Sequence, residues 1–297
     1  MKNLLFVLWA CSIVLSSCSK SGSTETATPV GNQNSNTTNV SAVPSTFTQK
    51  VLLEILTGAG QPQCTDGTSK MNDLVNANPT TAITACIHYS DAMEIPLYTV
   101  LESTFSNGMP PSFPTAMVNR IPSTGITILN RTQWLSNVNV NKQKTAKCGV
   151  AMKTNVNAGV ATIEAHAGFN QNLTGNYNIT LYLVENDVTG NGNQYDQRNS
   201  YNVTSGHAYY QAGDPIVGFQ HNYTVRKVIS ANLGDALSAT NMHSSGEEVK
   251  NYSISISGFK EDDLYVIAFI NKVGTSATTH EIMNVQRVKL GATKDWD

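Results

Sequence analysis

Charged residues are scarce in this sequence. Lys, Arg, Asp and Glu together make up 13% of its 297 residues, and the formal net charge is -2. No basic stripe runs along any segment, so the chain lacks the positive surface on which nucleic-acid binding depends. Its Asn, Thr, Ser and Gly content is instead typical of an extracytoplasmic protein rich in β-strands. We therefore expect no nucleic-acid partner.

Long apolar runs are also missing. No later stretch reaches the roughly 20 apolar residues that a membrane-spanning helix needs. The one apolar run covers residues 4–15, follows a short basic opening and has the length of a signal-peptide core. It ends in Leu-Ser-Ser-Cys18, which resembles the lipobox of bacterial lipoproteins. That resemblance implies a signal peptide over residues 1–17 and a lipid on Cys18. An ordinary secretion signal with an incidental cysteine is the alternative.

Residues 18–46 are nearly free of charge and of large apolar side chains. Glu25 is their only acid and Lys20 their only base. Such a stretch cannot bury enough apolar surface to offset the entropy lost on ordering, so we predict a flexible tether. About 250 residues remain, which favours two domains over one. We place these domains at residues 47–147 and 148–297.

Cysteines are few in this sequence, and an odd number of them remains in the mature chain, which is not the pattern of a fold held together by disulfides. Of the five, Cys11 leaves with the signal peptide and Cys18 carries the lipid. Cys64, Cys86 and Cys148 remain. Because three is odd, at least one of them stays free or pairs with another molecule.

The most informative absence is that of a second cysteine near Cys64. An apolar strand at residues 51–56 leads into a Gly-rich loop, and a helix is predicted over residues 66–76. This is the layout of a thioredoxin-type strand, Cys-x-x-Cys loop and helix, but Gln61 occupies the first cysteine position. Dithiol exchange needs one thiol to attack and a second to resolve the mixed disulfide. Cys64 therefore cannot cycle alone.

The following elements continue the thioredoxin-like order. A buried strand is predicted at residues 81–89 and a helix at 93–105. Phe113-Pro114-Thr115 then precedes an apolar strand, in the manner of the cis-proline loop that faces the redox motif in thioredoxin-like proteins. We predict that the Phe113–Pro114 bond is cis, because X-Pro is where a cis peptide costs little. A different small α/β domain, with Cys64 as an ordinary loop residue, is the alternative.

The second half alternates apolar and polar residues with a period of two. This pattern predicts strands at residues 161–167, 179–183 and 252–256. Residues 264–270 are apolar on both faces and predict a central strand, and a last strand lies near residues 283–290. Short strands separated by Gly, Asn and Asp turns are typical of an antiparallel β-sandwich, which could be a jelly roll.

The loop at residues 186–196 is the one weak candidate for a metal site. Asp187, Asn191 and Asp196 offer oxygen ligands, but Ca²⁺ takes 6–8 oxygens and usually several carboxylates. The Asn-Gly pairs of this loop are equally typical of hairpin turns. We therefore expect no metal and no cofactor. Tyr209, Tyr210 and Phe219 could form a recognition surface for sugar or peptide, or could belong to the core.

The chain resembles the Omp28-related outer-membrane lipoprotein family from about residue 50 to its C-terminus. The resemblance rests on residues 50–58, the loop to Cys64, and residues 113–120, 179–187 and 219–226. It implies a thioredoxin-like domain followed by a β-domain, anchored at the outer membrane. Many relatives carry Cys-x-x-Cys in the loop, but this chain matches only the second cysteine, so no redox role carries over.

Three functional hypotheses follow. The leading one is a non-catalytic lipoprotein that binds or adheres to a protein, peptide or glycan. The alternative is a thiol-disulfide protein that acts through Cys64 alone, although a monothiol enzyme normally uses the first cysteine of the motif. A structural component of the envelope without a small ligand is the third. Membrane contact is expected through the lipid, on the periplasmic or the surface side of the outer membrane.

Overall fold

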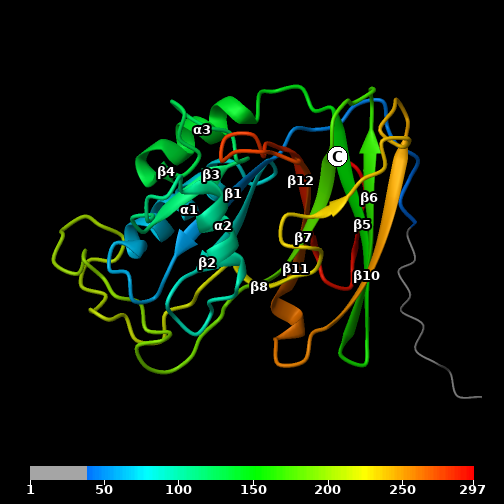
Figure 1. Ribbon diagram of the computed structural model, residues 1–297. Coiled ribbons are helices and arrows are strands. Elements are labelled where there is room, and N and C mark those ends of the chain that lie inside the picture. The colour runs from blue at the N-terminus through cyan, green and yellow to red at the C-terminus, as the bar shows by residue number, and fades with distance from the viewer. Residues whose placement is uncertain (1–38) are drawn as a thin grey trace, which may run out of the picture. The chain divides into compact units, whose positions relative to one another are not determined.

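The computed structural model describes residues 39–297 (Figure 1). The predicted signal peptide at 1–17, the lipidation site Cys18 and most of the predicted tether lie outside the described residues. All described residues belong to one compact unit, Thr37–Asp297. Within residues 39–297, no helix has the length and apolar character to span a bilayer.

The first half alternates strands and helices in the predicted order. Its elements are β1 (Val51–Thr57), α1 (Cys64–Ala77), β2 (Ala82–His88), α2 (Leu97–Phe105), β3 (Thr115–Val118), β4 (Leu129–Asn130), the 3-10 turn η1 (Arg131–Gln133) and α3 (Trp134–Asn141). Strands β1 and β2 are parallel, whereas β3 runs antiparallel to β1 and β4 antiparallel to β3. Both parallel strands are buried along their whole length, which explains their continuous apolar sequences.

The second half is built of strands that pair antiparallel with one another. Its elements are β5 (Cys148–Asn157), β6 (Val160–Phe169), β7 (Tyr177–Glu185), β8 (Thr224–Val228), β9 (Asp235–Ala236), β10 (Glu247–Ser255), the turn η2 (Glu261–Asp263), β11 (Leu264–Lys272), β12 (Ile282–Lys289) and β13 (Thr293–Lys294). The predicted central strand is confirmed, because β11 pairs with β7 on one side and β12 on the other. The connectivity of a jelly roll stays a prediction.

One sheet runs through both halves of the chain. Its order is β12-β11-β7-β8-β2-β1-β3-β4, with β9 on β7, while β10-β6-β5-β13 form a second sheet. The junction is the contact of β2 with β8, where only Cys86 and Thr224 are register partners. The predicted boundary between residues 147 and 148 falls between α3 and β5, but strands from both sides of it share this sheet.

Among residues 39–297, three large apolar cores lie between these layers, beside a small fourth cluster of Ala59, Met93 and Val188. Helices α1 and α3 cover one face of β1 and β3, with Trp134 fully buried between them. Helix α2 lies over the other face, and its core also takes in Tyr182 of β7 and Phe269 of β11. The third core lies between the β5–β6 sheet and strands β7 and β11. The core under α2 therefore belongs to both halves.

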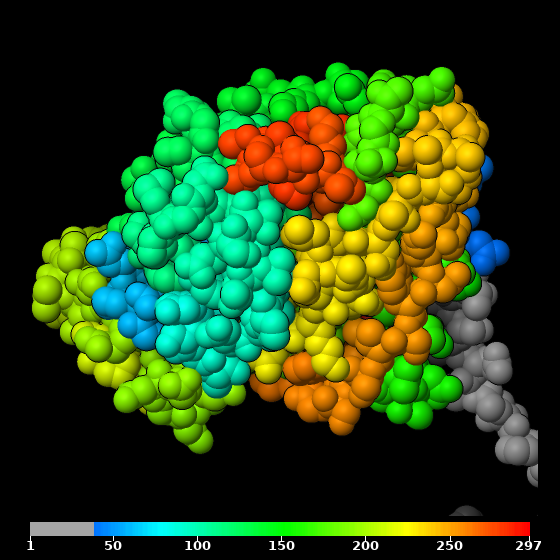
Figure 2. All heavy atoms as spheres, viewed as in Figure 1, coloured from blue at the N-terminus to red at the C-terminus, as the bar shows by residue number. Residues whose placement is uncertain are grey.

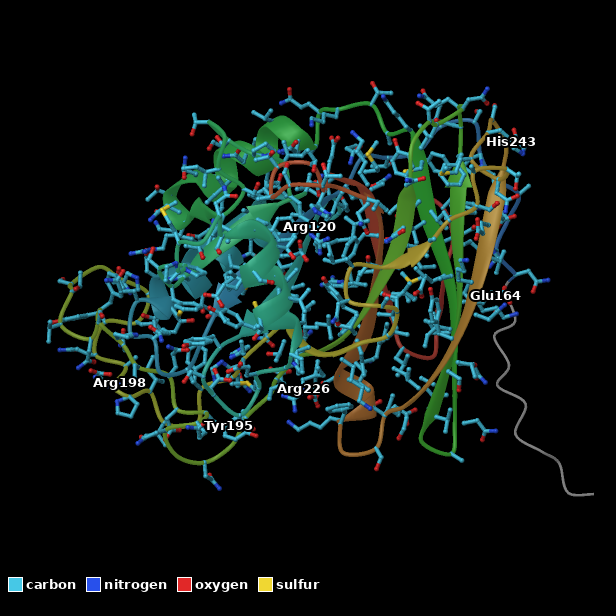
Figure 3. All side chains as sticks on the ribbon, viewed as in Figure 1. Arg120, Glu164, Tyr195, Arg198, Arg226 and His243 are labelled. Carbon is cyan, nitrogen blue, oxygen red and sulfur yellow. The ribbon has the colours of Figure 1, made fainter. Side chains whose placement is uncertain are left out.

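A buried ion pair lies in the core under α2. Arg120, which follows β3, donates from Nε and Nη2 to the two carboxylate oxygens of Glu54 in β1, at 2.7 Å each. The Tyr182 hydroxyl donates to Glu54 Oε1 at 3.0 Å. The Arg120 guanidinium also lies 5.2 Å from the ring centres of Phe105 and Phe269. Arg120 is the labelled interior side chain between helices and sheet in Figure 3.

This pair has no access to solvent, since Glu54 and Arg120 are both 0% exposed. Attraction by Glu54 raises the pKa of Arg120 despite the burial that opposes it, so the guanidinium stays charged. Arg120 Nη1 has no hydrogen-bond partner among residues 39–297. A buried pair of this kind costs much desolvation, and its value lies in fixing which surfaces meet.

We predict that Glu54→Gln lowers the free energy of unfolding by about 3–5 kcal/mol, because it leaves a buried guanidinium without its counter-charge. Lys272→Gln is the matched control, since it breaks a half-exposed pair with Glu281 and is expected to cost at most about 1 kcal/mol. Urea unfolding of both variants measures the difference. Equal costs for the two variants would show that the buried pair contributes no more to stability than a half-exposed one.

Candidate functional site

The loop that should carry a redox motif connects β1 to α1. It spans residues 58–63, and α1 begins at Cys64, two residues earlier than predicted. The Cys64 amide donates to Gln61 O at 3.0 Å, which closes the turn. Gly58 is required here, because a Cβ at this position would lie 2.6 Å from the carbonyl oxygen of Tyr89. Gln61 is half-buried, whereas Cys64 is only 1% exposed.

Cys64 is held as a neutral thiol. Burial raises the pKa of Cys64 to about 11, although hydrogen bonds involving Thr57 and Gly58 oppose the shift. A helix N-terminus normally lowers a thiol pKa, but desolvation outweighs that effect at this position. Because the thiolate is the nucleophile, this burial disfavours reaction at Cys64 near neutral pH.

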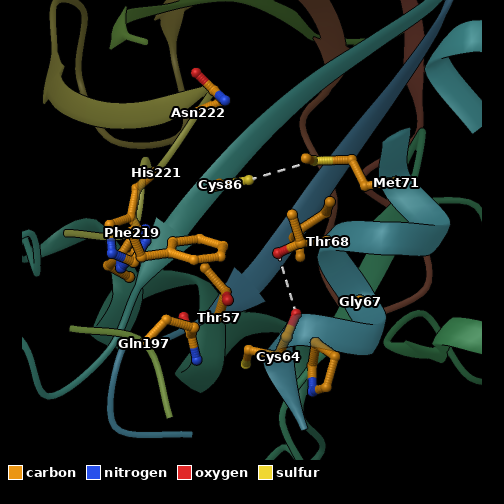
Figure 4. A pocket seen from close by; sticks show the side chains of 13 residues that line it. Thr57, Cys64, Gly67, Thr68, Met71, Cys86, Gln197, Phe219, His221 and Asn222 are labelled. Atoms are coloured by element: carbon orange, nitrogen blue, oxygen red, sulfur yellow. Dashed lines mark hydrogen bonds between the residues drawn. The ribbon is translucent and has the colours of Figure 1, made fainter. Parts of the chain in front are cut away.

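Pro114 lies directly against the Cys64 helix. The Phe113–Pro114 bond is cis, as the sequence predicts. Gly67 in the first turns of α1 permits the approach, because a Cβ there would lie 2.5 Å from Pro114 Cγ. Cys64 and Pro114 share the wall of an enclosed cavity of about 20 Å³, just large enough for one water molecule (Figure 4).

A long connection closes this site from outside. Residues 186–223 link β7 to β8, and we call them the covering segment. Gln197 Nε2 donates to Ala59 O and Gln61 O at 3.2 and 3.1 Å. The amides of Arg198 and Ser200 donate to Ala59 O and Pro62 O, each at 2.8 Å. Figure 2 shows the yellow-green atoms of this segment against the light-blue atoms of the loop after β1.

Further contacts fasten the covering segment to α1. Arg131 pairs with Asp66 in the first turn of α1 and donates from Nη2 to the Tyr201 hydroxyl at 3.0 Å. Thr65 Oγ1 donates to Asn199 Oδ1 at 3.2 Å. Partial burial opposes a lower pKa for Asp66, but the hydrogen bond from Arg131 and the charge of Lys70 lower it. Asp66 therefore stays ionised and keeps its partner.

Two histidines line the same cavity without contacting the thiol. His88 Nδ1 is 2.7 Å from Asp91 Oδ2, and the His221 ring lies edge-on to His88 at 5.1 Å. Burial lowers the pKa of His221 to about 4, so its ring is neutral, and Nε2 donates to Tyr195 O at 2.8 Å. Within residues 39–297, no hydrogen bond joins Cys64 to either ring. The described hydrogen bonds of the two rings are with Asp91 and the Tyr195 carbonyl oxygen.

The candidate cation ligands serve the covering segment instead. Asp196 is buried and accepts from the Gly218 amide at 3.0 Å. Asp187 donates its amide to Asn222 Oδ1 at 3.0 Å, and Asn191 is exposed. In residues 39–297 no three His, Cys, Asp or Glu side chains are grouped as a metal site would require. These hydrogen bonds of Asp187 and Asp196 are therefore with main-chain and side-chain groups of the covering segment.

The sequence predicts Gln61, Cys64 and Pro114 as residues of this site, but it does not predict that the covering segment lies over them. Gln197 and Asn199 are both 2% exposed, and neither stands in a recognisable motif. The available signal was the length of the connection, because a long loop without secondary structure in a compact domain is commonly functional. Of the aromatic candidates, Phe219 is buried in the cavity wall, Tyr209 is half-buried and Tyr210 is exposed.

A sequence profile described as outer membrane protein Omp28 matches residues 107–294, which is more than half of the chain. The chain belongs to the Omp28 family. As a family member it is associated with the outer membrane. The matched region begins after the Cys64 loop and includes the Pro114 loop, the covering segment and nearly all of the second half. No curated protein matches the chain.

Two solved structures resemble this Omp28 family member in fold. HBP35 of Porphyromonas gingivalis is similar over 82% of this chain and 76% of its own, with a TM-score of 0.65 and 21% identity. A protein of Agrobacterium tumefaciens solved by a structural genomics consortium is similar over 82% of this chain and 95% of its own, with a TM-score of 0.50 and 10% identity. At these identities the likeness concerns the fold alone.

Proposed function

We propose that this Omp28 family protein is a non-catalytic lipoprotein, anchored to the outer membrane through a lipid on Cys18, that binds a protein, peptide or glycan. The observation that carries the proposal is the lone thiol of Cys64, which lies buried beneath the covering segment. The thioredoxin-like scaffold has Gln61 at the first cysteine position of the loop and encloses the one thiol at the second. What remains is a rigid body with an additional loop surface.

The thioredoxin-like assignment of residues 47–147 is supported by topology. Strand order β2-β1-β3-β4, with β1 and β2 parallel and β3 and β4 antiparallel, follows the expected strand and helix sequence. Helices α1 and α3 pack on one face and α2 on the other. Pro114 faces the start of α1, where a redox motif would sit.

The buried sulfur atoms argue against the thiol-disulfide alternative. Burial raises the pKa of Cys86 to about 12, and its Sγ lies 3.7 Å from Met71 Sδ. Cys64, Cys86 and Cys148 are all free and buried. A neutral thiol is a poor nucleophile toward a disulfide, and the covering segment keeps an incoming disulfide away from the sulfur of Cys64.

The covering segment is the surface that best supports binding. Val203 and Val217 are 84% and 79% exposed, and Tyr210 is 41% exposed. Exposed apolar side chains gathered on one segment are typical of recognition surfaces. The segment lies at the end of the molecule away from β10, as Figure 1 shows.

The start of the described chain lies on the β5 side of the molecule, away from the covering segment. Residues 41–47 lie against the C-terminal residues and β5: Ser41 Oγ donates to Asp295 at 2.5 Å, and the Phe47 ring meets Trp296 at 5.8 Å. Phe47 packs over Gly149 in β5, where a Cβ would lie 2.2 Å from Phe47 Cδ1. A lipid-bearing tether would therefore join the body on the β5–β6 side and leave the covering segment free.

We expect the protein not to accelerate insulin reduction by dithiothreitol. Gln61→Cys is the matched comparison, because it restores the Cys-x-x-Cys spacing on the same scaffold. Turbidity of the insulin B chain gives the rate. Reduction by the natural protein at the rate of a dithiol enzyme, lost in Cys64→Ser, would establish the thiol-disulfide alternative and refute the proposal.

We expect Cys18→Ala to release the protein from the membrane. Without the thiol no lipid can be attached, and residues 39–297 contain no helix that could span a bilayer in its place. Cell fractionation with detection of the protein in pellet and supernatant measures the shift, with Cys148→Ala as the control that should stay in the pellet. Retention of Cys18→Ala in the membrane pellet would contradict lipid anchoring.

A further inference from the structure

Strand β10 ends the second sheet with its outer edge open. The two strand orders end in β12, β4, β10 and β13, of which β4 and β13 have only two residues each. The edge of β12 is partly closed, because its Ile282 amide donates to Asn119 O at 2.8 Å and the main chain of residues 48–50 bonds to its Asn284 side chain. β10 has nine residues, and no strand of residues 39–297 pairs with its far side (Figure 1).

The main-chain groups that face this open edge belong to the odd-numbered residues of β10. The two even-numbered residues that flank the strand, Gly246 and Ile256, hydrogen-bond through their main chain to β6 or to the residue before it, at 3.0 Å each. Hydrogen-bonded pairs alternate along an antiparallel ladder, so the even-numbered residues of β10 bond to β6 and the odd-numbered ones point away. The N–H and C=O groups of Val249, Asn251 and Ser253 therefore face outward.

β10 has few of the features that prevent an edge from pairing with another strand. Its register with β6 is unbroken over all nine residues, so no bulge twists it away, and it contains no proline. Its charged side chains stand in the first half, and residues 251–255 are uncharged. Val249 is 41% exposed, so the outer face is open beside the edge as well. An open row of N–H and C=O groups of this kind pairs readily with a further strand.

The strand is complementary to a second copy of itself. When two copies of β10 run antiparallel with Asn251 opposite Asn251, every outward-facing residue has a partner, since residue 247 meets 255 and residue 249 meets 253. No charged side chain then faces a like charge, which would destabilise the pairing. The charged residues Glu247, Glu248 and Lys250 lie opposite Ser255, Ile254 and Tyr252.

A cation stands where the acidic end of the second copy would come. Lys227 Nζ donates to Ser255 O at 2.6 Å, on the open edge, and Lys227 forms no ion pair among residues 39–297. Antiparallel pairing places Glu247 and Glu248 of the second copy beside Ser255 and thus near this ammonium group. Glu247 contacts His166 of its own chain, but its side chain is still 33% exposed and can meet Lys227 as well. This charge complementarity favours a second copy over an unrelated peptide.

We propose that two copies of this protein pair through the open edges of β10, antiparallel and with Asn251 at the two-fold axis. The two four-stranded sheets then form one continuous sheet. The inference goes beyond the proposed binding function and does not depend on it. The covering segment lies at the other end of each copy, so the pairing leaves both covering segments exposed.

Sedimentation equilibrium tests the pairing. The sample is the mature full chain with Cys18→Ala, so that no lipid or detergent drives association. We expect the mass to rise from that of one chain to that of two as the concentration increases. Asn251→Pro removes the outward N–H of both copies, and an edge strand tolerates proline where its N–H faces away from the sheet. It should raise the dimer dissociation constant at least about tenfold, whereas Asn251→Ala, which keeps the N–H, should change it less than about threefold.

Cysteine cross-linking tests the register. Residues opposite each other in a hydrogen-bonded pair lie about 5.5 Å apart at Cα, within reach of a disulfide. Chains with Val249→Cys, mixed with chains that carry Ser253→Cys, should form a disulfide-linked dimer on mild oxidation. Either variant alone should stay largely unlinked, because the register separates identical positions and the natural thiols of the body are buried.

The mass of a single chain at every concentration, or no linked dimer in the mixture, would overturn the proposal. Equal dimerisation of Asn251→Pro and Asn251→Ala would place the contact on another surface. Chains with Val249→Cys that link to one another as fast as to Ser253→Cys chains would overturn the register. If circular dichroism shows that Asn251→Pro unfolds, the cross-linking result decides alone.

Discussion

The buried pair of Glu54 and Arg120 is the interaction on which the arrangement of this protein depends. Strand pairing contributes little where β2 meets β8, since these two strands share a single register pair. Side chains must therefore specify how the halves meet. Glu54 comes from β1, Arg120 follows β3, and Tyr182 comes from β7. The hydrogen bonds of Tyr182 to Glu54 and Arg120 therefore join the second half to the buried pair of the first.

The covered thiol is a consequence of this junction. The covering segment leaves β7 and returns as β8, which lies beside β2. Its two ends are joined by the pairing of Val188 with His221, close to the carboxyl end of β2 at His88. The loop before Cys64 follows the neighbouring strand β1 at the same edge of the sheet. Fixing the halves therefore brings the segment over the thiol, and the apolar enclosure keeps that thiol protonated.

Local features of the fold could be predicted from the sequence because they arise from nearby residues. The apolar runs at β1 and β2, the alternation in β6, β7 and β10, and the Phe113-Pro114-Thr115 loop each mark their own element. The sequence also shows directly that Gln61, and not a cysteine, occupies the first position of the redox motif. These observations located Cys64 and Pro114, which the structure brings to one cavity.

The joining of the halves could not be predicted, because it depends on pairings between distant residues. Cys86 meets Thr224, and Glu54 meets Tyr182, without any periodicity that would indicate it. The position of the covering segment could not be predicted either, because Gln197 donates to main-chain carbonyl groups, which have no sequence signature. For the same reason the sequence does not show that Asp196, a weak candidate for a cation ligand, accepts a hydrogen bond from the Gly218 amide.

The most direct test of the account is the alkylation rate of Cys64, measured by mass spectrometry of its peptide against that of Cys148 in the same molecule. Both thiols are buried, but only Cys64 lies under the covering segment, so Cys148 reports global unfolding. We predict that Cys64 reacts as slowly as Cys148 in the natural protein. Gln197→Ala removes the bonds to the loop carbonyls and should speed Cys64 alone by about tenfold or more. Rapid alkylation of Cys64 in the natural protein, with Cys148 protected, would contradict the claim that the segment closes the site.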